Sequence, residues 1–323
     1  MVIFRAGNEG MSRAEVAGPV IGIVGPTASG KTDLALALAR IWPVEFLVAD
    51  SRQVYRGMDI GTAKPDAVAQ AAVPHHLLDL VDPDEPFTVA HWVERARSLL
   101  PEIGRRGRIP MLLGGTGLYV SALLDGHDYA SQPSVSGVRA RLTEALEADG
   151  LAPFADRLRT VDPEAAERTD LHNPRRVLRA LERFETAGGG VAPASEPFGR
   201  RIALLGINRP REMLYRRINQ RARRLFATGL LDEVRALLDA GYGPELRPMS
   251  GHGYREAERH LAGEWSLDEA IEMTARRTRQ YAKRQLTWFG RDPRISWLSA
   301  GEEPTDDPDL VERADALIRL GGH

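Results

Sequence analysis

The chain has 323 residues, of which 43% are hydrophobic and 27% are charged, and its net charge is −2. These values are those of an ordinary soluble protein with one large or two smaller domains. The absence of cysteine excludes disulfides and thiolate metal sites. No apolar run approaches the roughly 20 residues of a membrane span, so we expect no membrane partner.

The first residues carry no targeting signal that we can identify. Residues 1–18 contain charges and glycines but no apolar core, so we expect a loose leader rather than a secretion signal. Translation can start at Met1 or at Met11. The lack of cysteine suits a reducing cytoplasm, where we place the protein.

Strand and helix patterns alternate in the first part of the chain. Strands are expected at 20–24, 44–49 and 109–113, and helices at 31–41, 88–104 and 117–124. This order is typical of a parallel sheet that helices cover on both faces.

Only helical patterns follow between about residues 128 and 200. They cover 138–149, 151–160 and 173–184, and the last begins with Asn173 as N-cap and Pro174 in the first turn. The glycine-rich run 188–197 is expected to be a mobile loop.

Strand character returns at 201–207 and 295–298, on either side of helices at about 210–240, 252–262 and 266–289. We therefore predict an α/β fold whose P-loop NTPase-like core comprises residues 19–127 and 201–323, the latter with basic C-terminal helices. An all-helical domain, residues 128–200, is expected to be inserted into it.

Residues 25–32 (Gly-Pro-Thr-Ala-Ser-Gly-Lys-Thr) fit Gly-x-x-x-x-Gly-Lys-[Ser/Thr], the loop that cradles a pyrophosphate with backbone N–H groups and a lysine. The loop lies between a strand and a helix. The helix would therefore aim its free N–H groups and positive dipole end at bound phosphates. The motif predicts a diphosphate site without identifying the diphosphate as ATP.

Asp50 ends the second predicted strand, at the sheet edge where open α/β folds bind ligands. A carboxylate there could be a general base or a magnesium ligand, or it could cap the next turn. Residues 57–65 lack apolar periodicity and are expected to form a loop over the site. Lys64 in this loop is either a phosphate contact or a solvated lysine.

A second strand-to-helix turn, residues 114–117 (Gly-Gly-Thr-Gly), has glycines that allow the backbone to approach a ligand closely. Thr116 would lie at the same sheet edge, and a tight turn without a ligand role is the alternative. His75 and His76 have no partner at metal-ligand spacing, so we predict no transition-metal site.

Arginine is concentrated in two C-terminal segments. Residues 209–224 hold seven arginines against Glu212, and residues 271–294 are similarly basic. Such clusters favour a phosphate backbone as partner, and a solvated helix face is the alternative. The mixture of Arg, Lys, Tyr and Trp in residues 279–289 suits unpaired RNA, although its apolar residues have the spacing of a core-facing helix.

With these motifs in place, the chain resembles the bacterial tRNA dimethylallyltransferase (tRNA isopentenyltransferase) family from Gly25 to Trp297. The most restrictive motifs are Met-Asp-Ile-Gly-Thr-Ala-Lys-Pro (58–65) and Lys-Arg-Gln-Leu-Thr-Trp (283–288). Matching segments are also found at 50–55, 114–119, 173–176 and 253–255.

The resemblance implies transfer of a dimethylallyl group from dimethylallyl diphosphate to N6 of the adenosine 3′ of the tRNA anticodon, with release of pyrophosphate. The implied cofactor is Mg²⁺. The implied partners are dimethylallyl diphosphate and the tRNA anticodon stem-loop, and we expect a monomer.

Functional residues of the family carry over by motif. The residues that would hold the diphosphate are Gly25, Thr27, Ala28, Ser29, Gly30, Lys31 and Thr32, with the Thr32 hydroxyl on Mg²⁺. Lys31, Asp50 and Thr116 would be catalytic, with Asp50 as general base and Thr116 orienting the adenine amine. The positions that match tRNA-contacting stretches are Asp50, Ser51, Arg52, Gln53, Thr116, Arg139, Arg175, Arg176, Arg179, Gly253, Tyr254, Arg255, Lys283, Arg284, Gln285 and Trp288. Arg217 and Arg221 lie where the family places arginines near the active site.

The implied reaction uses the phosphate loop differently from a kinase, because the whole diphosphate would leave an allylic carbon. Lys31, Mg²⁺ and the loop amides would stabilise the charge on the departing pyrophosphate. Adenine N6 is a poor nucleophile, so a carboxylate that accepts its proton would be required. The base would have to leave the anticodon stack to reach Asp50.

Other classes remain open at this point. In a small-molecule kinase or ATPase, the arginine-rich helical insert could serve as a nucleotide lid. A non-catalytic RNA-binding module is disfavoured by the intact Lys31, Thr32 and Asp50. An adenylate isopentenyltransferase would act on free nucleotides, whereas the basic C-terminal helices favour tRNA.

Overall fold

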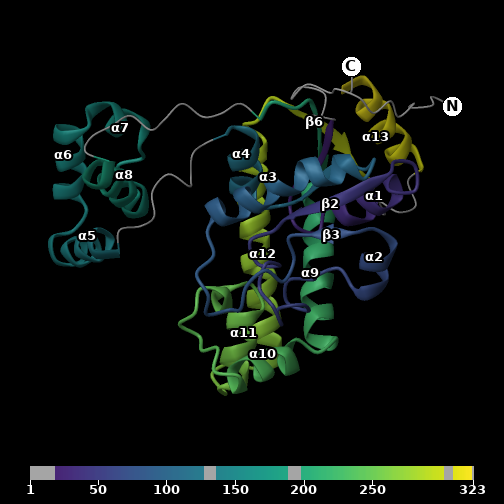
Figure 1. Cartoon of the computed structure of the whole chain (residues 1–323). Helices are drawn as coiled ribbons and strands as arrows, with labels where there is room; N and C mark the ends of the chain where they lie inside the picture. Colours follow the sequence, from purple (N-terminus) through teal and green to yellow (C-terminus); the bar gives the residue numbers. More distant parts are fainter. Residues whose placement is uncertain (1–18, 127–135, 188–197, 302–307, 322–323) are drawn as a thin grey trace. The chain divides into compact units, whose positions relative to one another are not determined.

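The computed structural model describes residues 19–126, 136–187, 198–301 and 308–321 (Figure 1). These residues form two compact units, which we describe separately. The larger unit comprises Met1–Asp125 with Pro197–His323, and the smaller unit comprises Gly126–Glu196. The leader at 1–18 and the loop at 188–197 lie outside the described residues.

The larger unit contains a six-stranded sheet with the order β3-β2-β4-β1-β5-β6. Its strands are β1 Val20–Val24, β2 Val44–Ala49, β3 His75–His76, β4 Ile109–Gly114, β5 Ile202–Asn208 and β6 Ile295–Ser299. All neighbouring strands are parallel. β1 and β2 are buried along their whole length, as expected where helices cover both faces of a sheet. The predicted α/β class with a parallel sheet core is confirmed.

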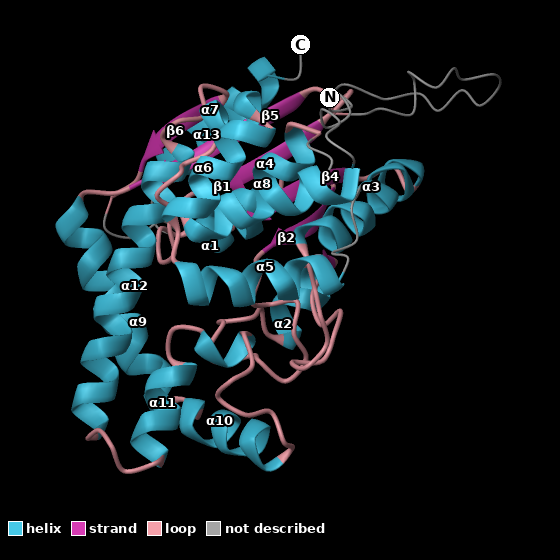
Figure 2. Cartoon of the chain, turned by 90° about the vertical axis from the view of Figure 1, so that its left-hand side faces the viewer, coloured by secondary structure: helices cyan, strands magenta, loops and turns pink. Residues whose placement is uncertain are grey.

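Helices enclose this sheet (Figure 2). α1 (Lys31–Leu38) and α13 (Pro308–Gly321) share one apolar cluster with the strands, in which α1 Leu34 and α13 Ile318 pack with β2 Phe46. α3 (Val89–Arg105) and α4 (Gly117–Leu124) pack together, with their Trp92 and Tyr119 rings stacked at 4.8 Å. A short helix, α2 (Ala67–Ala72), precedes β3.

The C-terminal part adds α9 (Arg211–Ala227), α10 (Leu230–Asp239), η1 (Pro248–Ser250), α11 (Tyr254–Leu261) and α12 (Leu267–Phe289). α9 and α12 run side by side away from the sheet (Figures 1 and 2), and Leu214 and Ile218 pack with Ala282 between them. The segment expected to be helical at about 210–240 is divided, because Gly229 has a φ of 110° in the left-handed region.

The smaller unit consists, in its described residues, of helices and turns. These helices are α5 Ser136–Asp149, α6 Ala152–Val161, α7 Pro163–Arg168 and α8 Pro174–Ala187. Leu142, Phe154 and Leu181 are buried in their common core. Asn173 Oδ1 accepts a hydrogen bond from Arg176 N at 3.4 Å, as expected of an N-cap.

Strand register explains where the predicted motifs meet. Gly114 at the end of β4 is paired with Val24 of β1 and with Ala49 of β2. The phosphate loop, Asp50 and Thr116 follow these positions and therefore lie at one edge of the sheet. The helices that the structure describes are all too short or too polar to span a bilayer.

Candidate active site

The phosphate loop connects β1 to α1 with a backbone shaped for an anion. Gly25 and Gly30 have φ values of 138° and 95°, and Ala28 also has a positive φ, 63°. No side chain caps α1, so the N–H groups of its first turn are available to a ligand. The Ser29 hydroxyl is buried without a hydrogen-bond partner among the described residues. The loop thus contains hydrogen-bond donors without partners among the described residues.

Lys31 lies within this loop and donates a hydrogen bond from Nζ to Pro26 O at 2.7 Å. The pKa of Lys31 is lowered to about 7, mainly by burial and next by the nearby Arg221 guanidinium, while Asp50 acts in the opposite direction. A poorly solvated ammonium group of this kind gains strongly from an anionic ligand.

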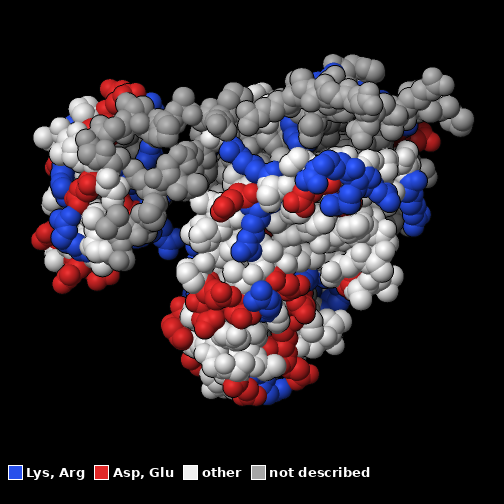
Figure 3. Space-filling model, viewed as in Figure 1, with Lys and Arg blue, Asp and Glu red and all other residues white. Residues whose placement is uncertain are grey.

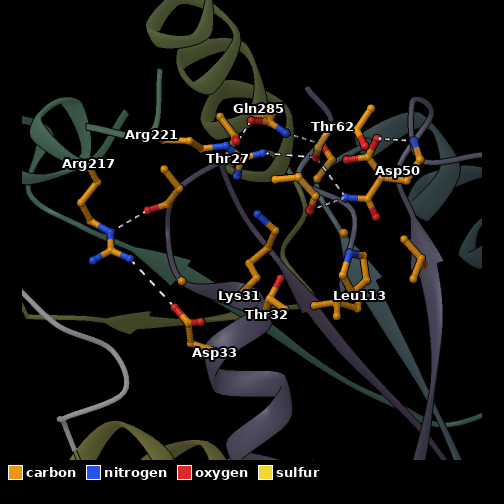
Figure 4. A pocket seen from close by; sticks show the side chains of 18 of the residues that line it. Thr27, Lys31, Thr32, Asp33, Asp50, Thr62, Leu113, Arg217, Arg221 and Gln285 are labelled. Carbon is orange, nitrogen blue, oxygen red and sulfur yellow. Dashed lines mark hydrogen bonds and ion pairs between the residues drawn. The ribbon is translucent and has the colours of Figure 1, made fainter. Parts of the chain in front are cut away.

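Three side chains from later parts of the chain, Arg209, Arg217 and Gln285, form hydrogen bonds with the phosphate-loop backbone. Arg209 Nε donates to Ser29 O at 2.8 Å, and Arg217 Nε donates to Ala28 O at 3.1 Å. Arg217 Nη2 also lies 4.0 Å from Asp33 Oδ2 (Figure 4). Because these arginines occupy loop carbonyl groups, they hold the backbone in its positive-φ conformation.

Gln285 of α12 provides the third of these contacts. Its Oε1 accepts a hydrogen bond from Thr27 N, and its Nε2 donates to Gly115 O, both at 2.8 Å. A Cβ at Gly115 would lie 2.3 Å from Gln285 Nε2, so only glycine fits there without displacement. One buried amide therefore joins the phosphate loop to the turn after β4.

Asp50 has the capping role considered from sequence. Its Oδ1 accepts hydrogen bonds from Arg52 N at 2.8 Å and from Gln53 N at 3.4 Å, so it caps the turn after β2. Its side chain also lines the adjoining cavities. Thr116 Oγ1 accepts from Ser51 N at 3.0 Å and thereby joins the two turns.

The first cavity has a volume of about 490 Å³ and opens beside the phosphate loop (Figure 4). The side chains around it are mostly polar or charged, with an apolar part formed by Val48 and Leu113. Both predicted arginines, Arg217 and Arg221, line it. Burial lowers the pKa of Arg221, and the nearby Asp50 carboxylate opposes this shift.

A second cavity, of about 280 Å³, lies next to the first. The two share Thr27, Asp50, Thr62, Arg221 and Tyr281. The shared residues place Asp50 where the cavities meet.

The second cavity has an apolar wall from α9 and unused polar groups elsewhere. His252 Nδ1 and Thr274 Oγ1 are buried and have no hydrogen-bond partner among the described residues. Burial, with the nearby Arg52, lowers the pKa of His252 to about 4, so its imidazole is neutral at pH 7. Neutral donors and acceptors beside an apolar wall are suited to a nucleobase.

Tyr281 was not assigned a role from sequence, although it belongs to the basic and aromatic segment 279–289. It lines both cavities, and its hydroxyl is hydrogen-bonded to Thr116. Burial raises the pKa of Tyr281 to about 12, so the hydroxyl stays protonated at pH 7.

Lys64 has neither of the roles considered from sequence. Its side chain is 3% exposed and its Nζ forms ion pairs with Asp59 and Asp79. The same Nζ donates to Tyr55 O at 3.0 Å. Lys64 therefore stabilises the 57–65 loop instead of reaching a phosphate or the solvent.

The residues predicted to contact tRNA fall into two groups in the larger unit. Lys283, Arg284, Trp288 and Arg255 are exposed. The others are engaged within the protein. Tyr254 and Gln285 are buried, and Gly253 precedes α11 with a φ of 98°. The Arg52 side chain donates to the carbonyl groups of residues 247 and 248, and the Gln53 side chain donates to those of residues 62 and 63.

In the smaller unit, Arg175 and Arg176 are exposed at the start of α8. Arg179 Nη1 donates to Glu182 Oε2 at 2.9 Å, and Arg139 Nη1 lies 3.6 Å from the same oxygen. Glu182 is 2% exposed. Its carboxylate brings together two of the predicted tRNA-binding arginines from separate helices.

Charge is segregated on the face shown in Figure 3, where Asp and Glu gather over α10 and α11. Lys and Arg lie mainly above them, over the sheet layer. The small net charge therefore conceals local surfaces of opposite sign.

The family model described as IPP transferase matches residues 53–292. A tRNA dimethylallyltransferase of Syntrophobacter fumaroxidans is 46% identical over 301 residues, which cover 92% of this chain and 87% of the relative. One of Geobacter sulfurreducens is 47% identical over 300 residues, 90% of this chain and 94% of the relative.

Two solved structures are similar over most of their length. The full-length tRNA isopentenylpyrophosphate transferase of Bacillus halodurans has a TM-score of 0.69 and 37% identity, covering 94% of this chain and 97% of that one. A eukaryotic dimethylallyltransferase, described as acting on tRNA, has a TM-score of 0.75 and 27% identity, covering 93% and 78%. The chain is a transferase and belongs to the IPP transferase family.

Proposed function

We propose that this protein transfers a dimethylallyl group from dimethylallyl diphosphate to N6 of the adenosine 3′ of the anticodon in tRNA, and releases pyrophosphate. The position of Asp50 carries the proposal, because its side chain lines both cavities. A diphosphate in the first cavity and a base in the second would meet at this carboxylate. The names of the relatives, and the neighbour described as acting on tRNA, support this pair of substrates.

The first cavity would take the diphosphate. The free amides at the start of α1, Lys31 and Arg221 all face it. As the allylic C–O bond breaks, negative charge grows on the departing pyrophosphate, and donors already in position stabilise that charge. Lys31, held over Pro26 O in the ligand-free loop, would turn to the phosphates.

We propose Mg²⁺ as the cofactor, and the oxygen donors present fit it. Thr32 is exposed in the first turn of α1, and Asp33 and Asp50 line the same cavity. Within the described ranges, no three His, Cys, Asp or Glu residues form a metal-binding group. An ion held by one or two side chains, the substrate phosphates and water needs no such group. Bound there, Mg²⁺ would supply additional charge neutralisation to the leaving group.

The second cavity would take the adenine, with its amine directed to Asp50. Accepting a proton from N6 as the new C–N bond forms would contribute about 10²–10⁴-fold to the rate. Thr116, which accepts a hydrogen bond from Ser51 N next to Asp50, and Tyr281, which lines both cavities, would provide the hydroxyls that orient the amine.

The exposed basic residues would hold the RNA. We propose that Lys283, Arg284, Trp288 and Arg255 contact the anticodon loop, since cations bind phosphates and an exposed indole can stack on a base. The smaller unit would act as an inserted domain that binds the stem through Arg175 and its neighbours on α8. We further propose that the enzyme is a cytoplasmic monomer.

Incubation of the protein with labelled dimethylallyl diphosphate, Mg²⁺ and an anticodon stem-loop tests the proposal. We expect label on the RNA, and none when the target adenosine is replaced by guanosine. Labelling of free AMP, ADP or ATP in preference to the stem-loop would contradict the tRNA assignment. Hydrolysis of ATP without RNA would support a kinase or ATPase, an alternative that the comparisons do not favour.

A further inference from the structure

The loop formed by residues 57–65 lines both cavities although it has no regular secondary structure. Thr62 belongs to both linings, Ala63 and Pro65 to the first and Gly61 to the second. Ala63 has a φ of 49°, a left-handed conformation that a loop keeps only when its surroundings enforce it.

One carboxylate organises the start of this loop. Glu233 of α10 accepts hydrogen bonds from three consecutive backbone amides, Asp59 N at 2.9 Å, Ile60 N at 2.6 Å and Gly61 N at 3.0 Å. The Tyr254 hydroxyl donates to the same carboxylate at 2.6 Å. A carboxylate is suited to this position, because it has acceptor sites for four donors and carries no donor of its own.

The contact with Tyr254 also sets how closely the loop can approach the helices. A Cβ at Gly61 would lie 2.3 Å from Tyr254 Cε2, so the loop backbone rests directly on the tyrosine ring. Tyr254 is 1% exposed, so the surrounding side chains leave its ring no room to move away from the loop. Glu233 and Tyr254 therefore fix the position of residues 59–61 together.

The next carbonyl group along the loop points toward the reacting groups. Thr62 O accepts hydrogen bonds from Arg221 Nη2 and from Gln53 Nε2, both at 3.2 Å. Both donors belong to side chains that line the first cavity. A displaced Thr62 carbonyl would release the Arg221 guanidinium from its place beside the shared space.

We propose that Glu233 is a positioning residue for the active site, which acts through residues 59–61 and the Thr62 carbonyl to hold Arg221 toward the diphosphate. It touches neither substrate in this arrangement. The inference rests on the proposed use of the first cavity, and it adds a residue from α10 that no motif indicated.

The variant Glu233→Gln tests this, because glutamine keeps the size of the side chain but turns an NH₂ group toward amide donors. The ligand is inorganic pyrophosphate with Mg²⁺, and its affinity is measured by calorimetry. We expect about tenfold weaker binding, the effect of one lost charge-assisted hydrogen bond. Asp232→Asn is the matched control, since Asp232 is the exposed neighbour on the same helix and, among the described residues, forms an ion pair with Arg235. We expect its affinity to be unchanged.

A double-mutant cycle separates positioning from a general loss of structure. In an Arg221→Lys background, which already lacks the guanidinium, Glu233→Gln should weaken pyrophosphate binding by less than about twofold, because coupled residues are not additive. The full tenfold loss in that background would overturn the proposal. So would wild-type affinity in the single variant.

Tyr254→Phe decides the question if Glu233→Gln does not fold. It removes one of the four hydrogen bonds to the carboxylate and keeps the ring under Gly61. We expect Tyr254→Phe to weaken pyrophosphate binding less than Glu233→Gln does, and to have little effect in the Arg221→Lys background. The same loss of affinity in both backgrounds would overturn the proposal. Pyrophosphate binding by a wild-type protein that labels no RNA would count against the proposed function and leave this test intact.

Discussion

The two cavities that meet at Asp50 are built in different ways. Short segments that follow β1, β2 and β4 form much of the first, and strand register brings these segments to one sheet edge, where arginines of α9 and Gln285 of α12 complete the lining. The second draws half of its lining from α9, α11 and α12, so its shape depends more on how those helices pack. Local motifs therefore predict the position of the first cavity, whereas tertiary packing determines the shape of the second.

Substitution of Asp50 should have the largest effect on activity, because Asp50 lines both cavities. Asp50→Asn keeps an Oδ1 acceptor for Arg52 N, so the turn stays capped while the base is lost. We expect kcat for labelling of the stem-loop to fall by about 10²–10⁴. Pyrophosphate affinity, measured by calorimetry, should change far less than kcat, because the loop amides, Lys31 and Arg221 remain in the first cavity. If kcat, pyrophosphate affinity and melting temperature all fell together, Asp50 would be shown to cap the turn and not to act as the base.

Gln285 connects the first cavity to the helices that build the second, and removing it should weaken both. Gln285→Ala leaves Thr27 N and Gly115 O without their partner, which costs about 1–3 kcal/mol per unsatisfied group. We expect a lower melting temperature and about tenfold weaker pyrophosphate binding. Thr287→Ala, an exposed change on the same helix, is the control. If both variants behave alike, the two regions are less coupled than the contacts indicate.

Lys31 provides a test confined to the first cavity. Its pKa is lowered to about 7 in the free protein, and a bound diphosphate would raise it again. Binding should therefore take up a proton at pH 8, and affinity should fall as the pH rises above 7. Calorimetry in buffers of different protonation enthalpy measures the uptake. Lys31→Arg, always protonated, should lack it, so equal uptake by both proteins would contradict the assignment.

Thr274 gives the smallest effect and is confined to the second cavity. Thr274→Val removes a buried hydroxyl without a described partner, so the free energy of unfolding should rise by up to about 1 kcal/mol. If the hydroxyl contacts the base, KM for the stem-loop should rise about 2–10-fold. Thr278→Val is the control, because its hydroxyl already donates to Thr274 O at 2.7 Å. A less stable variant with unchanged KM would show that the hydroxyl serves the fold alone.

The same contrast explains what the sequence could predict. Most strands and the phosphate loop follow from local patterns, because each lies within one continuous segment. Glu233 and Tyr281 lie on helices far along the chain from the turns that they support. Their contacts arise only when α10 and α12 pack against those turns, and no spacing rule relates such distant positions.

Some elements were missed for simpler reasons. α2 and α7 are six residues long, and β3 is two, so each is shorter than the roughly 11–18 residues of a helix, or 4–8 of a strand, over which a repeat of apolar positions can be recognised. α13 did carry a signal: Leu310, Ala314 and Ile318 recur every four residues and are buried in the core. Gly229, which divides α9 from α10, is a single glycine whose left-handed conformation is set by its surroundings.

The hydrogen bond between Thr27 and Gln285 joins residues 258 positions apart in the chain. A ribosome therefore releases the complete phosphate-loop motif long before it makes the residue that braces that loop. A chain interrupted before α12 would contain every residue of the motif and lack the bridge to Gly115. During synthesis, the proposed diphosphate site should be completed only near the end of translation, so unfinished chains should bind the proposed donor poorly.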